Sequence, residues 1–194
     1  MAKVKIGVLS LQGSVAEHER AVMRAGAECV RVGDKAALER VDGLIIPGGE
    51  STTIGKLLKL FKMHDLIKKR IEDGMPVFGT CAGLILLAKE IEGEEAHLGV
   101  MDIKVVRNAY GRQIDSFVSD GIVDGVSDKP IEMVFIRAPI IEKAYGETEV
   151  LARVDGRIVA ARERNMIVTS FHPELTDDTA MHGYFIEMVN RSKR

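Results

Sequence analysis

The sequence predicts one α/β domain with a mostly parallel sheet that helices cover on both faces. In the first half of the chain, short and nearly all-apolar segments alternate with segments of helical periodicity. Strands buried on both faces of a parallel sheet have this composition. The length of 194 residues suits a single core. The sequence contains no repeat, low-complexity tract or Pro-, Gly- or Ser-rich linker, so one domain over residues 1–194 is the simplest interpretation.

The first half reads as strand and helix in turn. Apolar side chains at Val15, Val22 and Met23 have the spacing of a helix over residues 14–26, which ends at a glycine. The third strand is stopped by Pro47 and two glycines. The same reasoning predicts strands at residues 4–9, 28–32, 44–46 and 76–78, and helices at 34–40, 52–61, 65–73 and 82–91.

The second half is richer in short β-like segments, which extend the same sheet or form an additional antiparallel patch. A last helix follows them, because its apolar residues recur at i, i+3, i+4, i+7 and i+8. These residues are Met181, Tyr184, Phe185, Met188 and Val189. The predicted strands are residues 100–106, 114–118, 131–136, 150–154, 157–161 and 166–169.

Composition excludes several classes of protein. Lys and Arg total 27 and Asp and Glu total 29, and the net charge of −2 argues against a dedicated nucleic-acid binder. No apolar run approaches the roughly 18 residues of a membrane span, and the N-terminus is typical of a strand rather than a signal peptide. The cysteines, Cys29 and Cys81, form no disulfide framework. We therefore expect a reduced, cytoplasmic protein, and we expect no metal because no Cys/His cluster is present.

A strand-to-helix turn at residues 79–83 has the sequence G-T-C-A-G, the pattern of a nucleophile elbow with Cys81 as the nucleophile. Such a turn exposes the sulfur at the carboxyl end of the sheet, where the following helix N-terminus favours the thiolate. The amide of Ala82 could also bind an oxyanion. The alternative is a small, buried structural cysteine.

A second pattern, F-H-P-E at residues 171–174, could supply the base that a cysteine nucleophile needs. Proline favours an extended predecessor, and residues two apart in an extended segment point the same way. His172 and Glu174 could then lie side by side. Alone, the pair is more simply a loop histidine and a helix-start acid; together with Cys81 it predicts a Cys-His-Glu triad.

A third pattern, P-G-G-E-S-T at residues 47–52, also lies between a strand and a helix. Ligands bind at this edge of open α/β sheets, and the amide of Gly49 is a candidate second oxyanion donor. The segment is not a phosphate-binding loop, because five residues separate Gly49 from Gly55 and Leu57 replaces the required Ser or Thr.

Two of the arginines could bind an anion, and three of the five histidines have spacings that can be judged against a metal site. Arg107 lies in a turn-like segment, and Arg137 follows Ile136 at the end of an apolar strand. Each guanidinium needs an anionic partner, either an internal carboxylate or that of a substrate, and the residues leave both options open. His18, His64 and His182 are expected to have no role in chemistry, because their spacing fits no metal site.

Together the three patterns resemble the class I, triad-type glutamine amidotransferases. Further stretches are similar to the glutaminase subunits of pyridoxal 5′-phosphate synthases, and they run from the first strand to the last helix. They are G-V-L-S-L-Q-G-S at 7–14, P-G-G-E-S-T-T at 47–53, G-T-C-A-G-L at 79–84, R-N-A-Y-G-R-Q at 107–113, F-I-R-A-P at 135–139 and F-H-P-E-L at 171–175.

The resemblance implies a three-layer α/β/α sandwich of flavodoxin-like kind that hydrolyses L-glutamine without a cofactor. It implies a triad of Cys81, His172 and Glu174, and oxyanion donors at Gly49 and Ala82. The residues implied to hold glutamine are Gly49, Glu50, Ser51, Arg107, Ile136 and Arg137. The implied partner is a (β/α)₈-barrel synthase subunit in a hetero-oligomeric complex, which receives the ammonia and makes pyridoxal 5′-phosphate. No nucleic-acid or membrane partner is implied.

Two rival interpretations have other functions. A cysteine peptidase or stress-response hydrolase of similar fold would also use an elbow cysteine, but glutamine explains the loop at residues 47–52 and the two arginines better. A regulatory subunit with a vestigial triad would only bind a synthase, and the intact set of Cys81, His172 and Glu174 argues against it.

Overall fold

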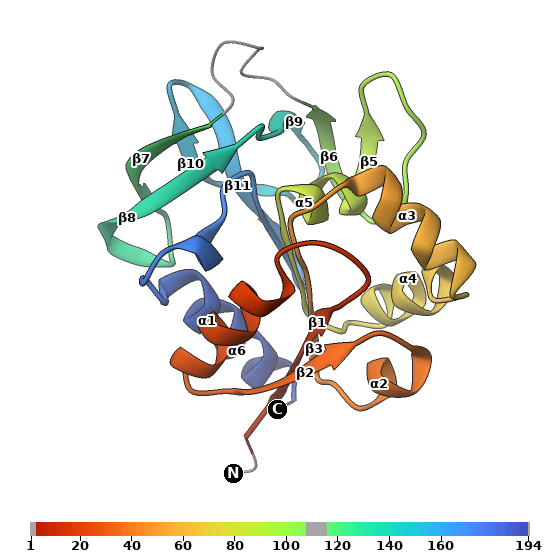
Figure 1. Ribbon diagram of the computed structural model, residues 1–194. Helices are drawn as coiled ribbons and strands as arrows, with labels where there is room; N and C mark the ends of the chain where they lie inside the picture. The colour runs from red at the N-terminus through yellow and green to blue at the C-terminus, as the bar shows by residue number, and fades with distance from the viewer. Residues whose placement is uncertain (1–2, 108–115, 194) are drawn as a thin grey trace.

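A sheet separates two layers of helices in the computed structural model, which describes residues 3–107 and 116–193 (Figure 1). Five neighbouring strands at one side of this sheet are parallel. In spatial order they are β2 (Glu28–Val32), β1 (Lys5–Leu9), β3 (Gly43–Ile46), β4 (Val77–Thr80) and β12 (Met166–Thr169). Every residue of β3, β4 and β12 is buried, as expected for central strands covered on both faces.

Beyond β12 the sheet continues mostly with antiparallel neighbours. The continuation is β11 (Arg157–Glu163), β9 (Ile140–Ala144), β6 (Met101–Val106) and β5 (Ala88–Ile91), with β10 (Glu149–Val154) also paired to β11. A separate hairpin joins β7 (Ser116–Val123) to β8 (Ser127–Ile136). The predicted parallel sheet with an antiparallel patch is thus confirmed.

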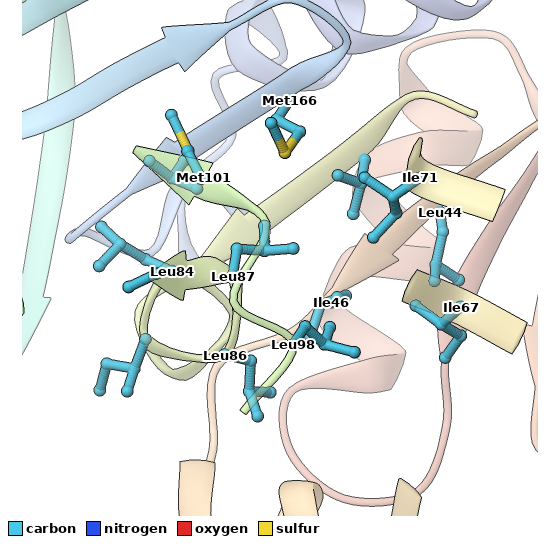
Figure 2. Close-up of a cluster of buried hydrophobic side chains, with 14 of the residues drawn as sticks. Leu44, Ile46, Ile67, Ile71, Leu84, Leu86, Leu87, Leu98, Met101 and Met166 are labelled. Carbon is cyan, nitrogen blue, oxygen red and sulfur yellow. The ribbon is translucent and has the colours of Figure 1, made fainter. Parts of the chain in front are cut away.

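The two faces of the sheet bury two clusters of apolar side chains. On β3, Leu44 and Ile46 join one cluster while Ile45 joins the other, because successive side chains of a strand point to opposite faces. The first cluster (Figure 2) packs under α2 (Lys35–Glu39), α3 (Ser51–Leu60), α4 (His64–Glu72) and α5 (Ala82–Leu87). The second packs under α1 (Val15–Arg24), α6 (Ala180–Ser192) and the β7–β8 hairpin. These are the three expected layers.

The structure differs from the predicted elements in two places. The helix expected at residues 82–91 ends at Leu87, and Ala88–Ile91 forms β5 in parallel pairing with β6. Ala88 already has extended dihedral angles, φ −61° and ψ 137°. The strand β9 was not predicted. Both strands depend on partners distant in sequence, which local periodicity does not reveal.

Two further predictions concern the edges of the described residues. The strand expected at residues 114–118 begins at Ser116, and its first two positions lie outside the described residues, as do positions 108–113 of the R-N-A-Y-G-R-Q stretch.

Within the described part of the chain, no helix has the length and apolar character needed to cross a membrane.

Candidate active site

The predicted site residues meet in one cleft of about 440 Å³ at the carboxyl ends of the parallel strands. This edge is where α/β sheets bind ligands, because the loops that follow the strands converge there. The predicted residues that line the cleft are Gly49, Glu50, Ser51, Cys81, Ala82, Arg107, Ile136, Arg137 and His172. Glu174 is the one predicted site residue that does not line the cleft, and it lies behind His172.

Cys81 lies at the tip of a sharp turn between β4 and α5. Its φ of +50° is in the left-handed region that non-glycine residues rarely adopt, and strained backbone of this kind is typical of functional sites. Its amide donates to the carbonyl of Thr169 on β12, at 2.8 Å. Two residues later, a side chain at Gly83 would overlap the carbonyl oxygen of Ile46. The turn is therefore held by the two neighbouring strands.

His172 and Glu174 form a buried pair next to Cys81. Nδ1 of His172 and Oε1 of Glu174 are 2.7 Å apart. The sequence suggested an extended segment here, but the structure has a 3₁₀ turn, η1 (Pro173–Leu175), which brings the two side chains together. The amide of His172 donates to the carbonyl of Val134 on β8 at 2.8 Å, so the hairpin helps to fix the position of His172.

The protonation of this pair follows from its contacts. Burial on its own lowers the pKa of His172, but hydrogen bonds with Cys81 and Glu174 outweigh burial and raise that pKa to about 10. Burial on its own raises the pKa of Glu174, but His18, His172 and Ser14 outweigh it and lower the pKa to about 2. At neutral pH the pair is therefore an imidazolium and a carboxylate, with the imidazolium beside the Cys81 sulfur.

Gly48 is a glycine because the side chains of His172 and Cys81 approach its backbone. A Cβ at this position would overlap Cε1 of His172 and lie 3.5 Å from Cβ of Cys81. Next to it, the amide of Glu50 donates to Oε1 of Gln12 at 2.8 Å. The amide of Ser14 donates to the carbonyl of Gly48 at 3.0 Å. The loop after β1 thus holds the loop after β3 against the cleft.

The two arginines of the cleft both have internal carboxylate partners. Nη1 of Arg107 lies 3.2 and 3.1 Å from the two carboxylate oxygens of Glu94. Nη2 of Arg137 lies 3.8 Å from Oε1 of Glu50, and both of these side chains are exposed. A positive and a negative group therefore stand together at the mouth of the cleft, within reach of an incoming ligand.

Sequence reasoning missed a group of polar residues behind Glu174. Ser14 Oγ donates to Glu174 Oε1 at 2.7 Å, and His18 Nε2 lies 3.5 Å from Oε2. His18 also contacts Thr80 and His182 at 3.0 Å each. The histidines were expected to have no role in chemistry. Ser14 is the N-cap of α1 and His18 lies four positions later, but this spacing alone does not indicate a role beside Glu174.

The described residues contain no cluster of three or more His, Cys, Asp or Glu side chains that could hold a metal ion. The second cysteine, Cys29, lies on β2 and is partly buried. Burial raises the pKa of its thiol to about 11, which keeps it protonated and unreactive at neutral pH. Of the two cysteines, Cys81 lines the cleft and Cys29 does not.

Comparison with known proteins agrees with this arrangement. The model of the SNO glutamine amidotransferase family matches residues 8–191. Proteins named pyridoxal 5′-phosphate synthase subunit PdxT are similar over almost their whole length. The protein from Carboxydothermus hydrogenoformans is 54% identical, covering 96% of this chain and 98% of its own. The protein from Clostridium botulinum is 52% identical, with 98% and 100% covered.

A solved structure, described as a crystal structure of glutamine amidotransferase, has a TM-score of 0.91 and 47% identity. The match covers 95% of this chain and 98% of that chain. A second, the structure of PurLQS from Thermotoga maritima, has a TM-score of 0.67 at 20% identity, covers 98% of this chain and 97% of that chain, and shows the same fold. By its sequence over nearly the whole length, this chain belongs to the SNO glutamine amidotransferase family.

Proposed function

We propose that this chain hydrolyses L-glutamine to L-glutamate and ammonia, and that it is the glutaminase subunit of a pyridoxal 5′-phosphate synthase. The observation that carries the proposal is the alignment of three groups. Cys81 lies at a strained turn, His172 contacts it, and Glu174 holds Nδ1 of His172 at 2.7 Å. In space, a nucleophile is thus followed by a base and the base by an orienting acceptor, as covalent amide hydrolysis requires.

The reaction begins when the Cys81 thiolate attacks the side-chain amide carbon of glutamine. The carbonyl oxygen becomes an oxyanion, which the backbone N–H groups of Gly49 and Ala82 stabilise. His172 donates its proton to the amide nitrogen, the C–N bond breaks, and ammonia leaves behind a γ-glutamyl thioester. The now neutral His172 takes a proton from water, whose oxygen attacks the thioester and releases glutamate and the thiolate.

Glutamine is a zwitterion at its other end, and the mouth of the cleft carries matching charges. The guanidinium groups of Arg107 and Arg137 suit the α-carboxylate, and the carboxylate of Glu50 suits the α-ammonium group. Binding exchanges the internal pairs of these arginines for pairs with the substrate. Ser51 and Ile136 complete the lining around the aliphatic part of the substrate.

The acceptor of ammonia is a separate synthase subunit, which is a (β/α)₈ barrel, in a hetero-oligomeric complex. The support is the name shared by relatives that are similar over the full chain, each called a subunit of pyridoxal 5′-phosphate synthase. We also propose that the complex works in the cytoplasm, where the reducing environment keeps the Cys81 thiol free.

The test measures glutamate release from glutamine by the purified chain, first alone and then together with the barrel subunit of a pyridoxal 5′-phosphate synthase. We expect a low rate alone and a sharp increase with the partner, and no activity in Cys81→Ala. A thiol-alkylating glutamine analogue should label wild-type Cys81. Absence of both turnover and labelling, with Cys81 reduced, would contradict the proposal and favour a regulatory subunit with a vestigial triad.

A further inference from the structure

A chain of buried polar groups extends from the triad into the layer between the sheet and helices α1 and α6. Its members are His18 on α1 and His182 on α6, both completely buried. Nδ1 of His18 is 3.0 Å from Nε2 of His182, although the residues are 164 positions apart. The other ring nitrogen of His18, Nε2, is 3.0 Å from Thr80 Oγ1 and 3.5 Å from Glu174 Oε2.

Both imidazoles are neutral at physiological pH. Burial is the main cause that lowers the pKa of His18, and His172 lowers it further. The carboxylates of Glu174 and Glu17 raise this pKa, but they do not outweigh burial. Burial also lowers the pKa of His182 to about 3, with His18 and Arg24 in the same direction and Glu174 against. A neutral imidazole carries one N–H and one bare nitrogen, so each ring has two possible tautomers.

The contacts select one tautomer for each ring. Nδ1 of His182 is buried and has no hydrogen-bond partner among the described residues. A proton there would be an unsatisfied buried donor, whereas a bare nitrogen costs less, so the proton of His182 lies on Nε2. His182 Nε2–H then donates to His18 Nδ1, and the proton of His18 must lie on Nε2.

That proton points toward the third member of the proposed triad. Oε1 of Glu174 already accepts from Ser14 and pairs with His172. Its second oxygen, Oε2, is buried and forms no hydrogen bond within the described part of the chain. His18 Nε2–H faces both this oxygen and Thr80 Oγ1, and supplies the partial positive charge that a buried carboxylate oxygen requires.

We infer that His18 is a positioning residue for amide hydrolysis: its Nε2–H holds the Glu174 carboxylate in place, and His182 fixes the tautomer of His18. The Glu174 carboxylate is bound at Oε1 by Ser14 and His172, and its Oε2 faces His18 Nε2–H across 3.5 Å. This placement keeps Nδ1–H of His172 directed at Oε1, so that Nε2 of His172 faces Cys81. The same arrangement recurs around metal-bound and catalytic histidines, whose orientation depends on the groups behind them. The inference rests on the proposed triad.

The test compares His18→Leu with His18→Gln in the complex with the synthase subunit. Leucine removes the N–H and fills a similar volume. The amide nitrogen of glutamine stands the same number of bonds from Cα as Nε2 of histidine, so it can donate to Glu174. We expect His18→Leu to lower kcat about 30-fold with KM changed less than about threefold, and His18→Gln to recover most of kcat.

A matched control separates this role from packing. Val22 lies one turn further along α1 and is fully buried, so Val22→Ala destabilises the same helix without touching the triad. The readout that packing cannot move is the alkaline limb of the pH profile of kcat/KM. A less firmly held Glu174 lowers the pKa of His172, so this limb moves down by about half to one pH unit in His18→Leu and stays in Val22→Ala.

Equal losses of kcat in His18→Leu and Val22→Ala, with no displacement of the alkaline limb, would overturn the inference. Nitrogen-15 NMR of the histidine side chains supplies a measurement that does not depend on activity. Protons on Nε2 of both His18 and His182 are expected, and a proton on Nδ1 of His18 would also overturn it. A wild-type complex without turnover but with these tautomers would instead contradict the proposed function.

Discussion

The proposed reacting groups and the proposed ligand-binding rim of the cleft are built in opposite ways. The side chains of His172 and Glu174 are 9% and 0% exposed, and hydrogen bonds with each other, with the Ser14 hydroxyl and with the backbone of Val134 hold these residues. The side chains of Arg137 and Glu50 are 66% and 54% exposed, and their nitrogen and oxygen atoms are 3.8 Å apart. The groups proposed for the chemistry are thus anchored in the core, whereas those proposed for recognition lie at the surface and can exchange partners.

The first consequence is that change at the reacting sulfur has the largest effect. Cys81→Ala should lower glutamate release by the complex at least about 10⁴-fold, because no other group of the cleft can form the thioester. The fold should be retained, since the methyl group fits the same turn. Activity assays and circular dichroism check both expectations. Cys29→Ala is the control, and equal loss in that variant would place the nucleophile elsewhere.

The second prediction concerns the buried charge pair. Glu174→Gln should lower kcat about 10³-fold, because a neutral amide no longer stabilises the imidazolium or fixes its orientation. The same substitution should also remove a pH-dependent contribution to the free energy of unfolding.

The signs of that pH dependence follow from the two pKa values. His172 has a pKa raised from 6.5 to about 10, so its stabilisation is complete below pH 6.5 and is lost as the pH rises to about 10. Glu174 has a pKa lowered from 4.5 to about 2, so its stabilisation is complete above pH 4.5 and is lost as the pH falls to about 2. The free energy of unfolding in urea should therefore be higher for wild type than for Glu174→Gln, and the difference should be largest between pH 4.5 and 6.5. A constant difference from pH 4 to 10 would contradict this.

A third prediction tests how tightly the core side of the cleft is built. The methyl group of Gly48→Ala would overlap the imidazole of His172, and displacing the base should lower kcat about 100-fold. Gly183→Ala is the matched control, because a Cβ at that position on α6 meets no atom within 4 Å. It should leave kcat unchanged and stabilise the helix slightly. Full activity in Gly48→Ala would mean that the base tolerates displacement.

The same contrast explains what the sequence could predict about the fold. The strand at residues 166–169 was predicted with the bounds that the structure has, because three of its four side chains are apolar, as is typical of a strand buried on both faces. The segment A-G-L-I-L-L-A-K-E-I reads as one helix, since every residue except glycine suits a helix. Its last four residues instead pair with β6, and no local pattern reveals that pairing.

For the candidate site, short motifs located Cys81, His172 and Glu174, because each motif combines chemistry with local backbone geometry. Ser14, His18 and His182 carry no such motif. His18 reaches Glu174 only because α1 packs beside η1, and it reaches His182 only because α1 and α6 cover the same face of the sheet. Such groups are set by tertiary packing, and a lone histidine on a helix gives no sign of them.

The smallest effects are expected at the rim, where one arginine can be compared directly with another. Arg137 and Arg164 both have a positive φ, 42° and 51°, and both pair with an exposed carboxylate. Exposed pairs of this kind contribute little to stability, so alanine at either position should change the free energy of unfolding by less than about 0.5 kcal/mol. Arg137 lines the cleft and pairs with Glu50, whereas the partner of Arg164 is Glu147.

Arg137→Ala should therefore raise the KM for glutamine about tenfold with kcat within about threefold, because it removes binding that substrate and transition state share. Arg164→Ala should change neither constant. Steady-state kinetics of the two variants in the complex separate the outcomes. If Arg137→Ala instead lowers kcat as strongly as Gly48→Ala, the rim takes part in the chemical step, and the division between an anchored reacting core and an exchangeable surface fails.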